Sequence, residues 1–216
     1  MKNRNLQITL IFMLGFTIAS FAQVTVERVL APFKSVSTNG SYDLELKKGN
    51  VEKVVIKGKN KEEIEKLKTE IEGDQLRIYQ KGSWSWGGGD HYSIEVYYKQ
   101  LEKIECSGSA DVTGEDLISG EEVKISLSGS GDIKLKKIDA KSLKVSVAGS
   151  GDIKIAGKAE NQKLSIAGSG DISAFDLITE KCEASVAGSG DIRLTATKNL
   201  KVSVAGSGDI FYKGNA

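Results

Sequence analysis

Six aspartates recur at nearly even spacing in the second half of this chain, and their carboxylates are the groups best arranged to do chemistry. They are Asp111, Asp132, Asp152, Asp171, Asp191 and Asp209, each in a serine- and glycine-rich motif, at spacings of 18 to 21 residues. Carboxylates stacked in register would repel each other by about 1 kcal/mol in water and by more near a protein surface. Hydrogen bonds from the serine and glycine amides of each motif would offset this repulsion, as in an Asx-type turn.

A row of calcium ions is the alternative role, because Ca²⁺ prefers carboxylate and carbonyl oxygens. It would use Asp132, Asp152, Asp171 and Asp191. The G-S-G-D motif shares glycine and aspartate with calcium-binding nonapeptide repeats, but its period is near twenty rather than nine. We favour the hydrogen-bonded role and expect no cofactor, with calcium as the candidate if one binds.

Catalysis by this acidic row would be that of a calcium-dependent polysaccharide lyase or hydrolase, which also needs a basic group. The acids repeat uniformly, whereas an acid and a base need different environments. The repeats contain no histidine, which a serine nucleophile would need as its base and which acyltransferase solenoids usually use as theirs. No G-x-S-x-G motif occurs in the chain. We therefore predict a non-enzymatic protein without catalytic residues, and keep the polysaccharide-active enzyme as the alternative.

Residues 82–92, GSWSWGGGDHY, break the pattern of the chain most strongly. Trp84 and Trp86 would share one face of an extended segment, and His91 follows three glycines. Aromatic faces beside such a loop can stack on sugars or anchor a partner, which makes these three residues candidate binding residues. The favoured interpretation is that the loop folds back over the rest of the protein.

The two cysteines, Cys106 and Cys182, lie four repeats apart. With one strand spacing per repeat they would be about 19 Å apart. A disulfide needs Cα atoms within about 7 Å. We predict two free thiols, and the absence of a C-x-x-C motif argues against a zinc or redox site.

The elements that hold the aspartates follow from the alternation around each of them. Apolar residues stand seven and five positions before the aspartate and one position after it, and polar residues stand six before. The seven-before column is Ile104, Ile125, Val145, Leu164, Ala184 and Val202; the five-before column is Cys106, Leu127, Val147, Ile166, Val186 and Val204; the one-after column is Val112, Ile133, Ile153, Ile172, Ile192 and Ile210; the polar column is Glu105, Ser126, Ser146, Ser165, Ser185 and Ser203. Alternation of period two predicts a strand, a GSGD turn, a second strand and a variable return.

One such unit cannot bury its apolar columns alone, so we predict an all-β fold in which the units stack. The result is a two-sheet β-solenoid with coils of about twenty residues, rising about 4.8 Å per coil. Two glycines flank the serine of each corner, where positive φ or close stacking excludes larger residues. They are Gly129, Gly131, Gly149, Gly151, Gly168, Gly170, Gly188, Gly190, Gly206 and Gly208. The first copy has Ala110 at the second glycine position, so its corner should differ.

The N-terminal part, residues 23–105, is less regular than the six GSGD-type coils of residues 106–216. We predict strands over 33–37, 42–46, 51–57, 76–80 and 93–98 and a short helix over 61–68. GSYD at 40–43 resembles an earlier copy of the corner. Since no linker separates the two parts, residues 23–216 are predicted to form a single domain.

Residues 1–22 have the features of a signal peptide. Lys2 and Arg4 precede an apolar stretch over 6–18, and Ala22 marks the predicted cleavage site. The stretch is too short for a membrane span, so no transmembrane anchor is expected. The mature protein is expected to be exported to a periplasm, the cell surface or the extracellular space.

The charges nearly balance, with 30 Lys and Arg against 29 Asp and Glu in 216 residues. Such a chain has no field that attracts nucleic acid or an anionic membrane. Long flat faces of serine, lysine and aspartate favour contact with another macromolecule, such as a carbohydrate or a cell-surface protein. Phe211 takes an outward position that is polar in the other coils, so the last coil should have an apolar open end. Either the N-terminal part covers this end or two chains meet there.

These patterns resemble the putative auto-transporter adhesin, head GIN domain family of exported bacterial proteins, a family of unknown function. The resemblance covers about residues 33–210, and is carried by GDQLRIY at 73–79, IEVYYKQLEKIECSGSADV at 94–112 and the GSGD repeats. It implies a two-sheet, right-handed β-helix with GSG at the tight turn, and an adhesin-like role. It supplies no catalytic residues.

Overall fold

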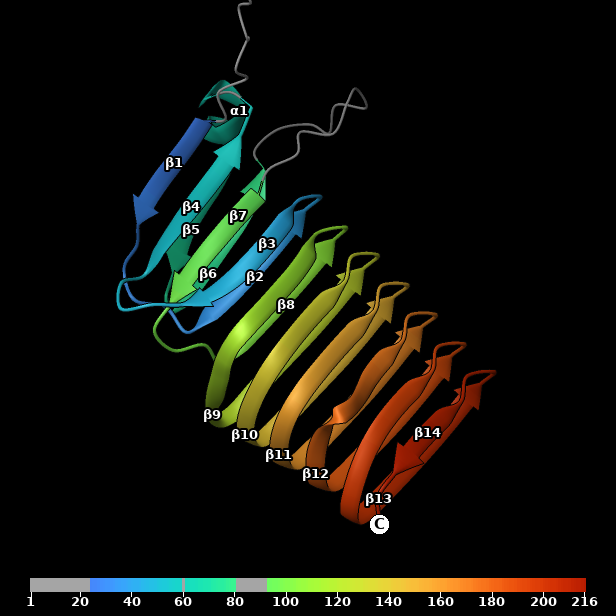
Figure 1. Cartoon of the computed structure of the whole chain (residues 1–216). Coiled ribbons are helices and arrows are strands. Elements are labelled where there is room, and N and C mark those ends of the chain that lie inside the picture. Colours follow the sequence, from blue (N-terminus) through green and yellow to red (C-terminus); the bar gives the residue numbers. More distant parts are fainter. Residues whose placement is uncertain (1–23, 60, 81–92) are drawn as a thin grey trace, which may run out of the picture.

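The computed structural model describes residues 24–59, 61–80 and 93–216, which form a β-solenoid of about six turns (Figure 1). The predicted all-β solenoid with coils of about twenty residues is therefore confirmed. The elements are β1 (Val24–Val29), β2 (Ser35–Gly40), β3 (Asp43–Lys48), β4 (Lys53–Gly58), α1 (Lys61–Lys66), β5 (Leu67–Glu72), β6 (Gln75–Gln80), β7 (Ser93–Tyr98), β8 (Lys103–Gly108), β9 (Asp111–Gly129), β10 (Ile133–Gly149), β11 (Ile153–Gly168), β12 (Ile172–Gly188), β13 (Ile192–Gly206) and β14 (Ile210–Lys213).

The long strands β9 to β13 each pass through two sheets that face each other. We call the sheet that follows each GSGD corner the first sheet, and the sheet that precedes each corner the second sheet. The strands pair in parallel with the repeats in register, so that Ser146 lies beside Ser126 and Ser165. Register shifts mark the bend between the two sheets, as between Leu135 and Ile138 of β10. The segment that follows the second strand of each repeat, for which the sequence predicted no regular structure, therefore also pairs in parallel with the neighbouring coils.

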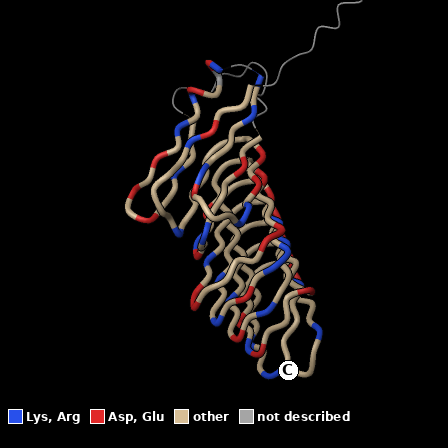
Figure 2. Tube along the Cα trace, turned by 60° about the vertical axis from the view of Figure 1, so that its left-hand side comes forward, with Lys and Arg blue, Asp and Glu red and all other residues tan. Residues whose placement is uncertain are grey.

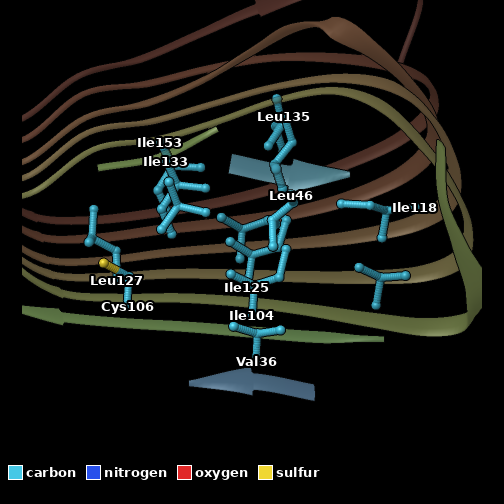
Figure 3. Close-up of a cluster of buried hydrophobic side chains, with 14 of the residues drawn as sticks. Val36, Leu46, Ile104, Cys106, Ile118, Ile125, Leu127, Ile133, Leu135 and Ile153 are labelled. Carbon is cyan, nitrogen blue, oxygen red and sulfur yellow. The ribbon is translucent and has the colours of Figure 1, made fainter. Parts of the chain in front are cut away.

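The core is built from the three predicted apolar columns, whose members pair one above the other as predicted. Figure 3 shows how the two sheets meet: Leu46 and Leu135 lie opposite Ile104 and Ile125. One step nearer the GSGD corner, Ile133 lies opposite Leu127 in the same view. These side chains are at most 2% exposed, so the columns form one continuous hydrophobic core.

The GSYD segment forms a true coil, but its place in the stack does not follow the order of the sequence. β2 pairs with both β6 and β8, and β3 pairs with both β7 and β9. The coil of residues 35–48 is therefore inserted between β6 and β7 on one side and β8 and the start of β9 on the other (Figure 1). Gly40 pairs with Gly108 and Asp43 pairs with Asp111, which confirms the faint repeat seen in the sequence.

Antiparallel strands end the parallel stack on its N-terminal side. β4 pairs with β7 and β1 with β4 in the first sheet, while β5 pairs with β6 in the second. α1 connects the two sheets and buries Ile64 against the core. Arg28 donates hydrogen bonds to the carbonyls of Ile64 at 3.1 Å and Leu67 at 2.8 Å, so the chain around the helix end is tied to β1.

The C-terminal end of the solenoid lies at the opposite end of the molecule from this cap (Figure 1). Of the two alternatives for the last coil, coverage by the N-terminal part is wrong for the described strands, because β1 and β14 occupy the two ends of the strand order. The physical reason is that the N-terminal strands join the stack on the far side of β3. Phe211 is 45% exposed, as expected for an open end.

Candidate functional site

The aspartates form a ladder along the GSGD corner, held by hydrogen bonds between coils. The backbone amide of each aspartate donates to the Oδ1 atom of the aspartate one coil earlier. The N···Oδ1 distances are 2.9 Å for Asp132 to Asp111, 3.1 Å for Asp152 to Asp132, 2.8 Å for Asp171 to Asp152, 2.8 Å for Asp191 to Asp171 and 3.0 Å for Asp209 to Asp191. The ladder therefore ties each corner to the next.

One detail differs from the sequence prediction. The carboxylates accept hydrogen bonds from the next coil rather than from the amides of their own corner, because a parallel stack places the next aspartate amide directly over each Oδ1 atom. Positive charge adds to this, since Arg193 bridges Asp171 at 3.2 Å and Asp191 at 3.1 Å, and Lys134 lies 3.3 Å from Asp132. These contacts offset repulsion between neighbouring carboxylates.

The carboxylates of the ladder are already engaged by groups of the protein. Calcium takes six to eight oxygen ligands, gathered from several groups around one point. Here the Oδ1 atoms of Asp132, Asp152, Asp171 and Asp191 already accept backbone amides, and three of the four carboxylates also meet Lys134 or Arg193. Within residues 24–59, 61–80 and 93–216, no group of three or more His, Cys, Asp or Glu side chains is arranged to hold a metal ion.

The corner glycines make this close stacking possible, in two different ways. The first glycine of each pair has positive φ, for example +141° at Gly149. The second glycine does not, but a Cβ on Gly151 would lie 1.9 Å from the carbonyl oxygen of Gly131 in the coil before. The first copy differs as expected, because Gly108 has a φ of +91° and Ala110 takes the second position.

The outer surface of the second sheet presents three straight columns of side chains, which we call the lysine–serine face. The first column carries Lys103, Lys124, Lys144, Lys163, Glu183 and Lys201; the second carries Glu105, Ser126, Ser146, Ser165, Ser185 and Ser203; the third carries Ser107, Ser128, Ala148, Ala167, Ala187 and Ala205. The alanines of the third column are exposed but have short side chains, so the serines and lysines beside them stay accessible from that side. The sequence pattern identified the serine column and missed the other two.

Charges on this face are mixed. Lys124 and Lys144 both approach Glu122, at 2.6 and 3.2 Å, and their hydrogen bonds lower the pKa of that carboxyl. An open polar groove lies at the N-terminal end of the face, lined by Lys34, Ser35, Glu72, Asp74, Gln75, Glu102, Lys103, Glu122 and Lys124. Figure 2 shows lysine, arginine and acidic residues along the whole length of the solenoid. The three columns therefore offer many hydrogen-bond donors and acceptors, with five lysines against the two glutamates Glu105 and Glu183.

The outer surface of the first sheet carries a different feature near the N-terminal end, a network around Glu95. Its carboxylate accepts hydrogen bonds from Lys57 at 2.7 Å and from the hydroxyl of Tyr97 at 2.9 Å, and Lys47 lies 3.1 Å away. The hydrogen bond from Lys57 is the main cause that lowers the pKa of Glu95 to about 2. Lys57 belongs to β4 and Lys47 to β3, the two strands beside β7, so these two ion pairs stabilise the pairing of β3, β7 and β4.

The pKa changes of the described carboxyls and of Tyr42 and Tyr98 keep each group in its usual charge state at neutral pH. General acid catalysis needs a carboxyl of raised pKa. The described carboxyls with a clear pKa change, Glu95 and Glu122, are both lowered by lysines. Burial raises the pKa of Tyr42 and Tyr98 to about 12, which keeps both hydroxyls neutral.

The remaining candidate residues divide between the described and undescribed parts of the chain. Trp84, Trp86 and His91 lie outside the described residues, as does the predicted signal peptide over 1–22. Cys106 and Cys182 are both buried and free, which confirms the prediction of two free thiols. No helix within residues 24–59, 61–80 and 93–216 is long and apolar enough to cross a membrane.

Comparison with known proteins agrees with this geometry. Residues 32–216 match the family model described as putative auto-transporter adhesin, head GIN domain. No curated protein matches the sequence.

Several solved structures share the fold. A putative adhesin from Bacteroides fragilis NCTC 9343 is 20% identical with a TM-score of 0.82, over 89% of this chain and 97% of that one. A putative lipid binding protein from Parabacteroides distasonis ATCC 8503 is 28% identical with a TM-score of 0.68, over 89% and 90% of the two chains. A putative adhesin from Parabacteroides merdae ATCC 43184 is 20% identical with a TM-score of 0.60, over 88% and 96%.

Proposed function

Since this chain belongs to the putative auto-transporter adhesin, head GIN domain family, we propose that it is an exported, non-enzymatic, adhesin-like protein that binds a macromolecule through its lysine–serine face. The observation that carries the proposal is the regularity of that face. Lysine, serine and a small residue recur in the same order on coil after coil, at the strand spacing of about 4.8 Å. A repetitive surface suits a partner that is itself repetitive, because each coil can add one similar contact.

A carbohydrate of a cell surface is the partner class that this chemistry fits best. Serine hydroxyls both donate and accept hydrogen bonds, and lysine adds three donors. Ser146 already donates to Ser126 at 3.0 Å, so the hydroxyls of the column are close enough to form a connected row. Sugar hydroxyls and carboxylates have complementary groups. The polar groove at the N-terminal end of the face gives such a chain a place to be anchored.

Matched variants on the two outer surfaces test which face binds. Ser165 and Ser173 are both half-buried serines of β11 and β12, but Ser165 belongs to the lysine–serine face and Ser173 points outward from the first sheet. Binding would be measured against immobilised neutral and acidic polysaccharides and against lipid vesicles. We expect Ser165→Glu to weaken polysaccharide binding about tenfold and Ser173→Glu to leave it unchanged, a difference of about 1.4 kcal/mol. Equal loss in both variants would contradict the assignment of the face, and binding to vesicles alone would contradict the carbohydrate partner.

The non-enzymatic part of the proposal has its own assay. The purified protein would be incubated with polyuronates, with and without EDTA, and the products separated by size. We expect no cleavage under either condition. Product that forms only without EDTA would favour a calcium-dependent polysaccharide lyase instead.

In this proposal the aspartate ladder has a structural role: it joins successive coils by hydrogen bonds and needs no cation. Calorimetric titration with Ca²⁺ should then give only the heat of dilution, and the melting temperature should be the same in calcium and in EDTA. Saturable binding of Ca²⁺ would contradict this role for Asp132, Asp152, Asp171 and Asp191.

A further inference from the structure

The C-terminal end of the solenoid combines an unpaired strand edge with exposed apolar side chains. Residues 199–206 of β13 pair with β12 on one side only, and β14 pairs only with β13, so no described strand covers their other side. Val202 is 52% exposed, Val204 45% and Tyr212 56%, although equivalent residues of inner coils are buried. An open edge of this kind is a template for pairing with another strand.

We propose that a second copy of this chain covers this end, related to the first by a two-fold axis that passes between Ser203 and the second copy's Ser203, and between Phe211 and the second copy's Phe211. The inference goes beyond the proposed binding function and does not depend on it. It rests on the way the two sheets face each other in the inner coils.

The axis follows from the alignment of the inner coils. In Figure 3, Leu135 of the first sheet lies opposite Ile125 of the second, and Ile133 lies opposite Leu127. Following the stacked columns to the last coil, Tyr212 takes the place of Leu135 and Val202 that of Ile125, while Ile210 and Val204 take the places of Ile133 and Leu127.

Ser203 is midway between Val202 and Val204, and Phe211 is midway between Ile210 and Tyr212. The two residues therefore lie opposite each other, and one axis perpendicular to both sheets can pass beside both, midway between each residue and its counterpart in the second copy. A rotation about this axis reverses the strand direction and keeps each sheet on its own side. Each end strand then pairs antiparallel with the same strand of the second copy.

This arrangement matches side chains of the same kind in both sheets. Val202 lies opposite the second copy's Val204, and Ile210 lies opposite the second copy's Tyr212, so inward apolar residues meet inward apolar residues. Asp209 lies opposite the second copy's Lys213, and the symmetry repeats this pair of opposite charges. The two hydrophobic cores join into one, and the unpaired backbone of each copy becomes the partner of the other.

The symmetry also extends the lysine–serine face. Because each sheet stays on its own side, the face of one copy continues directly into the face of the second. The dimer therefore presents twice as many coils to a partner on one surface, which raises avidity without a new type of contact.

A cysteine on the axis gives the sharpest test. In an antiparallel pair the Cα atoms of directly opposed residues lie about 4.5–5.5 Å apart, within the reach of a disulfide. Ser203→Cys should therefore give a covalent dimer under mild oxidation, in the full chain. Ser165→Cys is the matched control, since it lies in the same column two coils away from the end. The native Cys106 and Cys182 are buried and should not contribute.

Sedimentation and a charge exchange complete the test. The wild-type protein should show a monomer–dimer equilibrium, weakened about tenfold by Asp209→Lys and restored by Asp209→Lys combined with Lys213→Asp. Melting of each variant at low protein concentration shows whether it is folded. A monomer at all concentrations would overturn the proposal, as would a dimer in which Ser203→Cys forms no more disulfide than Ser165→Cys.

Discussion

Replacing Gly151 by alanine should strongly destabilise the solenoid, although the backbone of Gly151 is not in the positive-φ region that only glycine favours. The added Cβ would lie 1.9 Å from the carbonyl oxygen of Gly131, whereas real contacts of this kind are not shorter than 3.0 Å. The coils must therefore separate locally by about 1 Å at a spacing of about 4.8 Å. The clash is with backbone, so no side-chain rotation can relieve it.

The magnitude follows from the hydrogen bonds that this displacement breaks. The amides of Ser150 and Gly151 both donate to the carbonyl of Gly129, at 2.9 and 3.1 Å, and the amide of Asp152 donates to Asp132 at 3.1 Å. Each is worth about 1 kcal/mol, and overpacking adds about 1–3 kcal/mol. We expect a loss of about 4–6 kcal/mol in the free energy of unfolding. For a protein of this size that lowers the melting temperature by roughly 15 °C.

Thermal unfolding followed by circular dichroism, with Gly120→Ala as the control, checks this expectation. A Cβ on Gly120 would meet its nearest neighbour at 3.6 Å, an ordinary contact, and Gly120 also lacks positive φ. The control should melt within about 2 °C of the wild type. Equal melting temperatures for Gly151→Ala and the wild type would refute the argument that close stacking, rather than local conformation, selects glycine at this position.

Three further outcomes are expected. Asp152→Ala removes the acceptor for the amide of Asp171 and should lower the free energy of unfolding, measured by chemical denaturation, by about 1–2 kcal/mol. Asp152→Asn keeps an acceptor and should lower it by less than about 0.5 kcal/mol. Equal losses in the two variants would mean that charge, not hydrogen bonding, matters. The pKa of Glu95 is lowered to about 2, so its contribution to stability is present above about pH 4.5 and lost as the pH falls towards 2; Glu95→Gln should flatten stability across that range, and an unchanged pH profile would contradict this. Burial raises the pKa of Cys106 to about 11 and of Cys182 to about 12, so a thiol reagent at pH 8 should label both only after unfolding, and rapid labelling of the native protein would show that the core is open.

Much of the repetitive part of this protein was predictable because its contacts are mostly between segments about twenty residues apart. Each coil contacts mainly the coils before and after it, so a constant period of about twenty residues is enough to fix which side chains stack. Val145 could be placed between Ile125 and Leu164 by counting from the nearest aspartate, and the structure confirms this register. The prediction that the two cysteines are free followed from the same count.

The N-terminal part was predictable only as separate elements. All five strands expected there occur. The helix predicted over 61–68 is present as α1 but ends at Lys66, because Leu67 and Lys68 belong to β5, and both β1 and β5 were missed. Their antiparallel pairing depends on contacts between distant residues, which leave no fixed period in the sequence. The insertion of the 35–48 coil between later segments has the same origin. β3 pairs with β7 and β9, which are not its neighbours in the sequence, and the spacing of residues does not reveal such pairings.

By itself, then, the sequence determined the coil, its corner, its inward columns and the aspartate row, because alternation and period are properties of the chain order. Only the tertiary structure decided which atoms the aspartates bind, which glycines are held by φ and which by close approach, and that lysines form a straight column beside the serines. It also decided that the N-terminal strands close one end and leave the other open. These features depend on distances between coils, which arise only when the coils are stacked.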